Sequence, residues 1–298
     1  MGAQEQSIRW QTKSEVYGKL EGVRLQFVWK APGEAREIIW SMKTDGSDMR
    51  PAVDPELLFS GEARDLKLTP VRSPDGRYIA CVGRARDDDL WFLVDLKEKR
   101  LRTMRKGLGA IDDTNFAWTP DSKQVLFYAD AHYHLYQYTV ENGTLELHPM
   151  IHAKGFRIVD GGRGIVAVRD DAIEYLDRAG KMLKRVVLPK RLQANPEFAI
   201  PGPGTFISSD GRTFVLPLDK NSRRAVVSVD DIAKPMYEDD RWYLQSAFGP
   251  DGKALYFSER QSQEVMVLDL ASGRITRIAE LPGRGADGLT AFDSGKAR

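Results

Sequence analysis

The chain has 298 residues, and 44 Lys and Arg against 43 Asp and Glu leave it with a net charge of +1. This balance gives no basic footprint for nucleic acid, and the longest apolar run, Leu90 to Val94, is too short to span a bilayer. The single cysteine, Cys81, rules out an internal disulfide framework. Its place inside a predicted strand favours a buried, inert thiol over a nucleophile.

One turn signal recurs along the chain. Its clearest copy is Pro74-Asp75-Gly76, where Pro fixes φ, Asp bonds nearby backbone and Gly tolerates a positive φ. Full or weaker copies lie near positions 21, 75, 121, 160, 210 and 251. Two intervals measure 46 residues (75 to 121) and 41 residues (210 to 251). A period of about 40 to 50 residues is typical of propeller blades.

A second marker runs in phase with the first. After each turn and its strand, a short loop leads to another apolar strand that often ends in Asp. These strands are 38–40, 90–95, 135–138, 173–177, 225–230 and 265–269. Further hairpin signals such as Asn142-Gly143 and Ser272-Gly273 follow in most units. The two markers together predict a unit of four strands.

The repeats run from about 15 to 281 and predict one all-β domain, 1–298: a six-bladed β-propeller of four-stranded antiparallel meanders. Seven blades is the alternative, because 54 residues separate position 21 from 75. Residues 55–59 are consistent with one helical turn, and the fourth unit is weak. The segment 188–204 contains four prolines and two glycines, which oppose regular strand pairing before the fifth blade.

The tail, 282–298, is expected to close the ring. Its stretch Leu289 to Lys296 has the form of a strand followed by a turn, as in Asn115 to Lys123. A strand here would pair with the N-terminal blade and remove the exposed edges. The strand-like residues Ile8 to Gln11 are the alternative.

The stretches RSPDGRYIACVGRARDDDLWFLVDL and FGPDGKALYFSERQSQEVMVLDLASGRITRI resemble the blade repeat of TolB-type propellers, which also occurs in prolyl oligopeptidase-like enzymes. The resemblance is to the propeller alone, without the TolB N-terminal domain or a peptidase domain. It implies an envelope scaffold and a bacterial periplasm, if Met1-Gly2-Ala3 is an expression start on a mature chain. A cytoplasmic location is the alternative, and we expect a monomer.

Successive strands of a meander run in opposite directions, so the loops between them alternate between two faces of the ring. The Pro-Asp-Gly turns share one face, and the loops after each second strand share the other with the connections between blades. Loops carry function on rigid scaffolds, so the second face is the predicted binding face. Its candidate residues are Arg84, Arg86, Asp87, Asp112, Asp113, His132, Arg223, Arg224, Asp239, Asp240, Arg241, Trp242 and Arg260.

A catalytic or metal site is less well supported by the sequence than a binding face. Asp112-Asp113 and Asp239-Asp240 precede first strands, near the channel mouth, where carboxylates can hold a divalent cation. His132 and His134 share a side of a strand, but no further ligands are spaced for zinc. No nucleophile elbow, HExxH motif or P-loop is present. We therefore expect no cofactor.

These observations predict a non-catalytic propeller that binds a protein or peptide on its loop-rich face. The alternative is a lactonase- or lyase-like enzyme, or a small-ligand or metal-binding propeller, with its site at the channel mouth.

Overall fold

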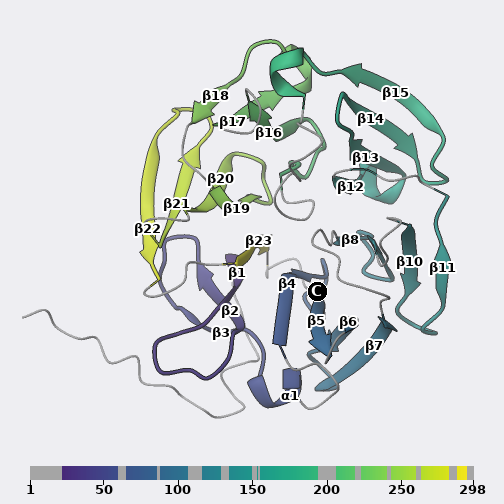
Figure 1. Ribbon diagram of the computed structural model, residues 1–298, viewed down its shortest axis with the longest axis vertical. Helices are drawn as coiled ribbons and strands as arrows, with labels where there is room; N and C mark the ends of the chain where they lie inside the picture. Colours follow the sequence, from purple (N-terminus) through teal and green to yellow (C-terminus); the bar gives the residue numbers. More distant parts are fainter. Residues whose placement is uncertain are drawn as a thin grey trace, which may run out of the picture.

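The computed structural model describes residues 22–59, 65–85, 88–106, 116–128, 134–149, 153, 155–193, 206–218, 223–239, 243–259, 263–281 and 287–293. These residues form six antiparallel sheets around one axis, a six-bladed β-propeller (Figure 1). The seven-bladed alternative is not adopted. Strand positions are counted below from the axis outward, as first to fourth.

Blades 1 to 3 each have four strands, with the sheet orders β23-β1-β2-β3, β4-β5-β6-β7 and β8-β9-β10-β11. Blade 1 comprises β23 (Asp287–Asp293), β1 (Val23–Trp29), β2 (Ile38–Lys43) and β3 (Arg50–Pro51). Blade 2 comprises β4 (Asp65–Arg72), β5 (Tyr78–Ala85), β6 (Asp88–Asp95) and β7 (Arg100–Lys106). Blade 3 comprises β8 (Phe116–Trp118), β9 (Gln124–Tyr128), β10 (Leu135–Thr139) and β11 (Leu145–Leu147).

Blades 4 and 6 are also four-stranded, although the sequence signal for blade 4 is weak. Blade 4 comprises β12 (Gly155–Val159), β13 (Gly164–Val168), β14 (Ala172–Asp177) and β15 (Met182–Val187). Blade 6 comprises β19 (Tyr243–Phe248), β20 (Ala254–Glu259), β21 (Glu264–Asp269) and β22 (Ile275–Glu280). β13 is apolar and buried along its whole length, so the second strand of blade 4 is clear although its turn is weak.

Blade 5 is the irregular one. It comprises β16 (Thr213–Leu218), β17 (Arg223–Ser228) and β18 (Tyr237–Asp239), and its first position holds only an isolated bridge from Ile207 to Phe214. The proline-rich segment leads into this position. Since each proline lacks the N–H that a ladder needs, a short bridge is what the sequence permits.

The ring is closed by the C-terminal strand, as predicted. β23 pairs antiparallel with β1 from Val23↔Asp293 to Val28↔Asp287 and becomes the first strand of blade 1. The alternative closing residues, 8–11, lie outside the described residues. The Thr290 hydroxyl and the Gln26 amide both donate to the Pro70 carbonyl of blade 2, at 3.1 and 3.0 Å, so the closed seam is hydrogen-bonded to its neighbour.

The core lies between blades rather than inside one central cluster. Separate groups of buried side chains fill the seams of blades 1 and 2, 2 and 3, 3 and 4, and 6 and 1, and one group joins blades 4, 5 and 6. Each fully buried Leu, Ile or Phe contributes about 1.5 to 3 kcal/mol. Two indole N–H groups also form hydrogen bonds between blades 2 and 3. Trp91 Nε1 donates to the Tyr128 carbonyl at 2.9 Å, and Trp118 Nε1 donates to the Val71 carbonyl at 3.0 Å.

Helical structure is short, as expected from the repeat. The helical turn predicted at 55–59 is confirmed as α1 (Pro55–Phe59), with the Asp54 carboxylate accepting from the Glu56 N–H at 2.9 Å. Single 3-10 turns occur at η1 (Asp160–Gly162), η2 (Lys190–Leu192) and η3 (Val229–Asp231). None of the described helices is long and apolar enough to cross a membrane.

Candidate functional site

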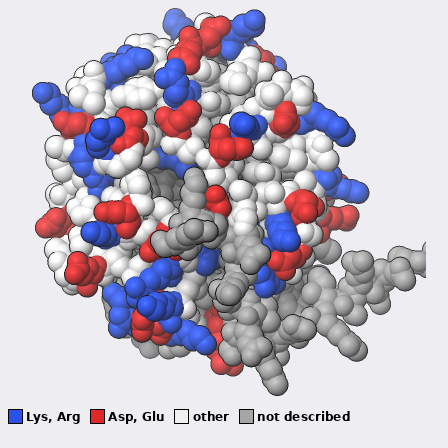
Figure 2. Space-filling view, turned by 180° about the vertical axis from the view of Figure 1, so that it is seen from behind, with Lys and Arg blue, Asp and Glu red and all other residues white. Residues whose placement is uncertain are grey.

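The strand order defines two faces of the ring. The turn face carries the turns between first and second strands and between third and fourth strands. The connection face carries the loops between second and third strands and the links between blades. In Figure 2, basic and acidic side chains are interspersed over one face of the molecule, with no single-sign field across it. Such a distribution fits the near-zero net charge.

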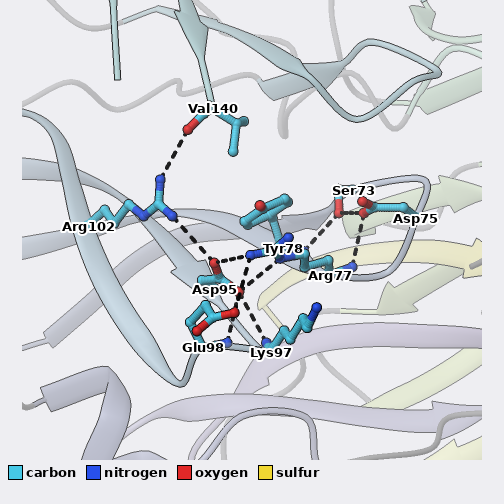
Figure 3. Close-up of polar contacts among 9 residues, drawn as sticks. All are labelled: Ser73, Asp75, Arg77, Tyr78, Asp95, Lys97, Glu98, Arg102 and Val140. Atoms are coloured by element: carbon cyan, nitrogen blue, oxygen red, sulfur yellow. Dashed lines mark hydrogen bonds and ion pairs between the residues drawn. The ribbon is translucent and has the colours of Figure 1, made fainter. Parts of the chain in front are cut away.

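On the turn face of blade 2, polar side chains bond within the blade, and Arg102 also donates to the Val140 carbonyl of blade 3 at 3.1 Å (Figure 3). The Ser73 hydroxyl donates to Asp75 Oδ1 at 2.5 Å and accepts from the Tyr78 N–H at 2.9 Å. Asp75 Oδ1 also accepts from the Arg77 N–H at 3.0 Å. The Ser73 hydroxyl and Asp75 Oδ1 are therefore hydrogen-bonded within the turn itself.

The Asp that ends the third strand completes this cluster. The buried Asp95 carboxylate accepts from Arg77 Nε and Nη2 at 3.2 and 2.9 Å and from the Lys97 and Glu98 N–H groups at 3.1 Å (Figure 3). Burial alone would raise the pKa of Asp95, but the Arg77 hydrogen bonds and the backbone donors outweigh burial and lower it. The recurring Asp is thus a structural carboxylate.

Other blades repeat the device with small changes. Thr119 and Asp121 form the turn in blade 3, where the Thr119 hydroxyl lowers the pKa of Asp121, and Ser208 and Asp210 form it in blade 5. Arg212 pairs with Asp230 in blade 5, as Arg77 pairs with Asp95 in blade 2. The hydroxyl two residues before the turn Asp was not singled out from the sequence, and its recurrence at fixed spacing was the available signal.

The connection face carries different contacts. Arg223 and Arg224 open β17 at this face, and β18 runs beside them in the register Arg224↔Asp239. Arg223 Nη1 lies 3.6 Å from Glu238 Oε2, while Arg191 of the link between blades 4 and 5 donates from Nη2 to Glu238 Oε1 at 2.6 Å. These groups are one-third to nearly one-half exposed. They form a charged, accessible cluster, named here the Glu238 cluster (Arg191, Arg223 and Glu238).

The remaining candidates divide in two. The backbones of Arg84 and Asp239 are placed in β5 and β18, with Arg84 opposite Asp89. The others lie outside the described residues, namely Arg86, Asp87, Asp112, Asp113, His132, Asp240, Arg241, Trp242 and Arg260. The structure therefore places Arg223 against Glu238, with Arg224 next along β17, and leaves the channel-mouth set as a prediction.

Two half-buried arginines on first strands were not anticipated. Arg157 of β12 donates from Nη1 to the Ile207 carbonyl of blade 5 at 2.8 Å, and burial lowers its pKa to about 10. Arg72 of β4 donates from Nε to the Gly76 carbonyl at 3.0 Å and lies over the Phe292 ring of blade 1, 4.9 Å from its centroid. Burial first, and then the charge of Arg24, lowers the pKa of Arg72 to about 10. Arg157 is the one charge in an apolar strand, which was its signal, and both residues join blades.

Metal binding finds no support within the described ranges, which hold no group of three or more His, Cys, Asp or Glu side chains placed to hold an ion. Cys81 is buried in β5, and burial raises the pKa of its thiol well above the usual value. The prediction of a buried, inert thiol is confirmed. His148 is buried against the Arg178 carbonyl, 3.0 Å from its Nε2, and burial lowers its pKa.

No protein-family profile and no curated protein sequence matches the chain. Solved structures do match in fold. TolB from Acinetobacter baumannii superposes with a TM-score of 0.64 at 16% identity, over 91% of this chain and 67% of that one. A chain of a nidogen–laminin complex gives a TM-score of 0.64 at 11% identity, over 92% of this chain and 99% of that one.

A third similar structure is a putative 6-phosphogluconolactonase from Bacteroides fragilis, with a TM-score of 0.53 at 12% identity over 92% of this chain and 98% of that one. Identities this low establish architecture alone. Together with the six four-position blades and the ring closed by β23, they show that this chain has the six-bladed β-propeller fold of the TolB type.

Proposed function

We propose that this protein is a non-catalytic scaffold that binds a protein or peptide partner on its connection face. The observation that carries the proposal is the contrast between the faces of blade 5. On the turn face, Asp210 and Asp230 bond within blade 5, whereas on the connection face Glu238 is shared by Arg223 of the blade and by Arg191 of the link from blade 4. Arginine is enriched at the centres of protein interfaces.

The structural neighbours support this proposal without deciding it. One belongs to a complex of nidogen with laminin, which is an assembly of two proteins, and another is TolB. Because a fold does not by itself imply a function, the argument depends on the cluster. The remaining candidates, from Arg84 and Arg86 through Arg260, stay predictions for the rest of this face.

The alternative is an enzyme or small-ligand protein with a site at the channel mouth, formed by Asp112, His132 and Asp240. The similarity to putative 6-phosphogluconolactonases favours it. A divalent cation that survives dialysis, together with lactone or ester turnover abolished by Asp112→Ala, would replace the scaffold proposal with this one. We propose instead that no cofactor is bound.

The test compares matched arginines on the two faces of blade 5. Arg223→Glu with Arg224→Glu alters the connection face, and Arg212→Glu alters the turn face, where Arg212 is also exposed and ion-paired. Tagged variants are returned to the native host, and the recovered partner is quantified by mass spectrometry, with melting temperature as the folding control. We expect the double variant to lose the partner and Arg212→Glu to retain it. The reverse pattern would place binding on the turn face.

Location and assembly complete the proposal. From the resemblance to TolB we propose a periplasmic location, and we propose that the protein acts as a monomer. Recovery of the protein in the cytoplasmic fraction of the native host would contradict the proposed location. A dimer in sedimentation at micromolar concentration would contradict the proposed monomer.

A further inference from the structure

The fourth strands, which form the outer rim, differ in how they protect their free edges. β3, β11 and β18 are only two or three residues long, and β3 ends in Pro51. β7 is long but basic, with Arg100 exposed and Lys97 and Lys99 exposed beside it. β22 exposes Thr276, Arg277 and Glu280 and half-buries its apolar residues. Shortness, proline and charge are the usual protections of an edge against pairing with another chain.

β15 of blade 4 has neither the shortness nor the proline, and its charge is confined to Lys184 and Arg185 at its centre. It is six residues long and exposes Met182, Leu183 and Val187 to 55%, 65% and 62%. Three of the five large apolar side chains that are exposed in the described part of the chain therefore lie on this one strand. Exposed apolar residues grouped on an edge are typical of interaction sites.

The backbone of β15 is available on one side. In the sheet order β12-β13-β14-β15 it is the terminal strand, paired only with β14 from Ala172↔Val187 to Leu176↔Met182. Figure 1 shows it at the outer margin of the ring, with no element beyond it. Its outward N–H and C=O groups can accept a further strand.

We propose that β15 binds an extended segment of another protein as a fifth strand of blade 4. The strand reads apolar at both ends with Lys184 and Arg185 in the centre, so the fitting segment has apolar ends and a central acidic pair. A second copy of this chain fits poorly. Antiparallel pairing of two β15 strands about their midpoint would place Lys184 opposite Arg185 of the other copy, and like charges directly opposite are destabilising.

Lys184 is placed to meet such a partner. Its ammonium lies 5.6 Å from the centroid of the Tyr175 ring, and Arg185 is held by Asp171 at 2.8 Å and Glu174 at 3.7 Å. Arg185 is thus already paired within blade 4, so Lys184 carries most of the attraction for the acidic pair of an added strand. The surface is distinct from the Glu238 cluster, since the two share no residue, and either can be disabled without the other.

The probe is a fluorescein-labelled synthetic peptide of about eight residues, two central glutamates flanked on each side by alternating valine and threonine. Binding to the full chain is followed by anisotropy. We expect saturable binding that Leu183→Lys with Val187→Lys weakens at least about tenfold. Leu147→Lys is the matched control, because Leu147 is a leucine of the neighbouring fourth strand that is also 62% exposed, and it should bind as wild type.

Two further measurements fix the mode of binding. Methylating the amide nitrogens along one edge of the peptide should abolish binding, since an added strand needs those donors. Hydrogen exchange of the wild-type protein should show amides of β15 protected by the peptide, which requires no variant to fold. No saturable binding, equal weakening by Leu147→Lys, or binding indifferent to methylation would each overturn the proposal. So would a dimer in sedimentation that Leu183→Lys dissociates, because a second copy would then cover the edge.

Discussion

The turn face and the connection face of this propeller differ in what their polar side chains contact. On the turn face of blade 2, Ser73, Asp75, Arg77 and Asp95 form one hydrogen-bonded cluster that needs no partner from outside. On the connection face, Arg191, Arg223 and Glu238 make part-exposed ion pairs between side chains. The first arrangement stabilises the blade, and the second leaves charges accessible. Changes on the turn face should therefore alter stability, and changes on the connection face should alter binding.

The largest expected effect is at Gly46, in the turn between β2 and β3. Gly46 has φ +83°, and a Cβ there would overlap the backbone carbonyl of Ile278 in blade 6. A backbone oxygen cannot rotate away, so Gly46→Ala should reduce the free energy of unfolding by about 3 kcal/mol or more. Urea denaturation followed by circular dichroism measures this.

Gly252 is the control for that change. It has φ +70°, but no atom lies within 4 Å of its Cβ position. Gly252→Ala should therefore cost only the strain of the positive φ, about 1 kcal/mol. Equal losses at the two sites would mean that contact between blades 1 and 6 contributes nothing at Gly46.

The second effect depends on pH. The pKa of Asp95 is lowered in the folded protein, so its contribution is complete above the unfolded value of about 3.9 and is lost as pH falls through the folded value. Asp95→Asn should reduce the free energy of unfolding by about 2 kcal/mol at pH 7. That difference from wild type should shrink as unfolding is measured at progressively lower pH, down to about pH 3.

Asp230→Asn offers the exposed counterpart, since Asp230 pairs with Arg212 at the surface. Its effect at pH 7 should be the smaller of the two. A pH-independent loss in Asp95→Asn would contradict the assignment of a structural carboxylate.

These same residues show which features of the fold could be predicted from the sequence. The turn Asp and the Asp ending each third strand were identified because they recur at a fixed spacing, and the structure shows that both bind the turns of their own blade. The closing strand was found for the same reason, as a copy of a first strand. Periodic features depend on local geometry, which sequence patterns record.

Apart from the recurring hydroxyl before the turn Asp, the features that escaped sequence analysis occur once. Arg72 over Phe292, Arg157 on the Ile207 carbonyl and Gln26 on the Pro70 carbonyl each join strands of different blades. A single sequence gives no signal for which blades' side chains meet. The candidate site could be checked only in part. Arg223 and Arg224 lie in β17, a strand that the repeat predicts, whereas Asp112, His132 and Arg241 lie outside the described residues.

A third prediction adds a turn-face interaction where one blade lacks it. Blade 6 has Gly249 at the position of Ser73, and its Asp251 carboxylate accepts from the Lys253 N–H at 3.0 Å. A Cβ at Gly249 would lie 3.3 Å from Asp251 Oδ1, a side-chain atom that can shift slightly, so a serine hydroxyl could donate to it. Gly249→Ser should raise the free energy of unfolding by about 0.5 to 1 kcal/mol. Gly249→Ala, which adds the Cβ without the donor, separates the hydrogen bond from the loss of glycine flexibility.

The smallest effect is expected on the connection face. Arg191 and Glu238 form an ion pair between side chains that are 44% and 32% exposed, where water screens the charges and holding two long side chains in place costs entropy. Arg191→Gln should therefore change the free energy of unfolding by no more than about 0.5 kcal/mol in urea. If Arg191 belongs to the proposed binding surface, the same variant should reduce recovery of the native partner although the fold is unaffected. A large loss of stability would instead mean that the Glu238 cluster holds blades 4 and 5 together. Polar side chains would then stabilise the fold on both faces, and the contrast between the faces would not hold.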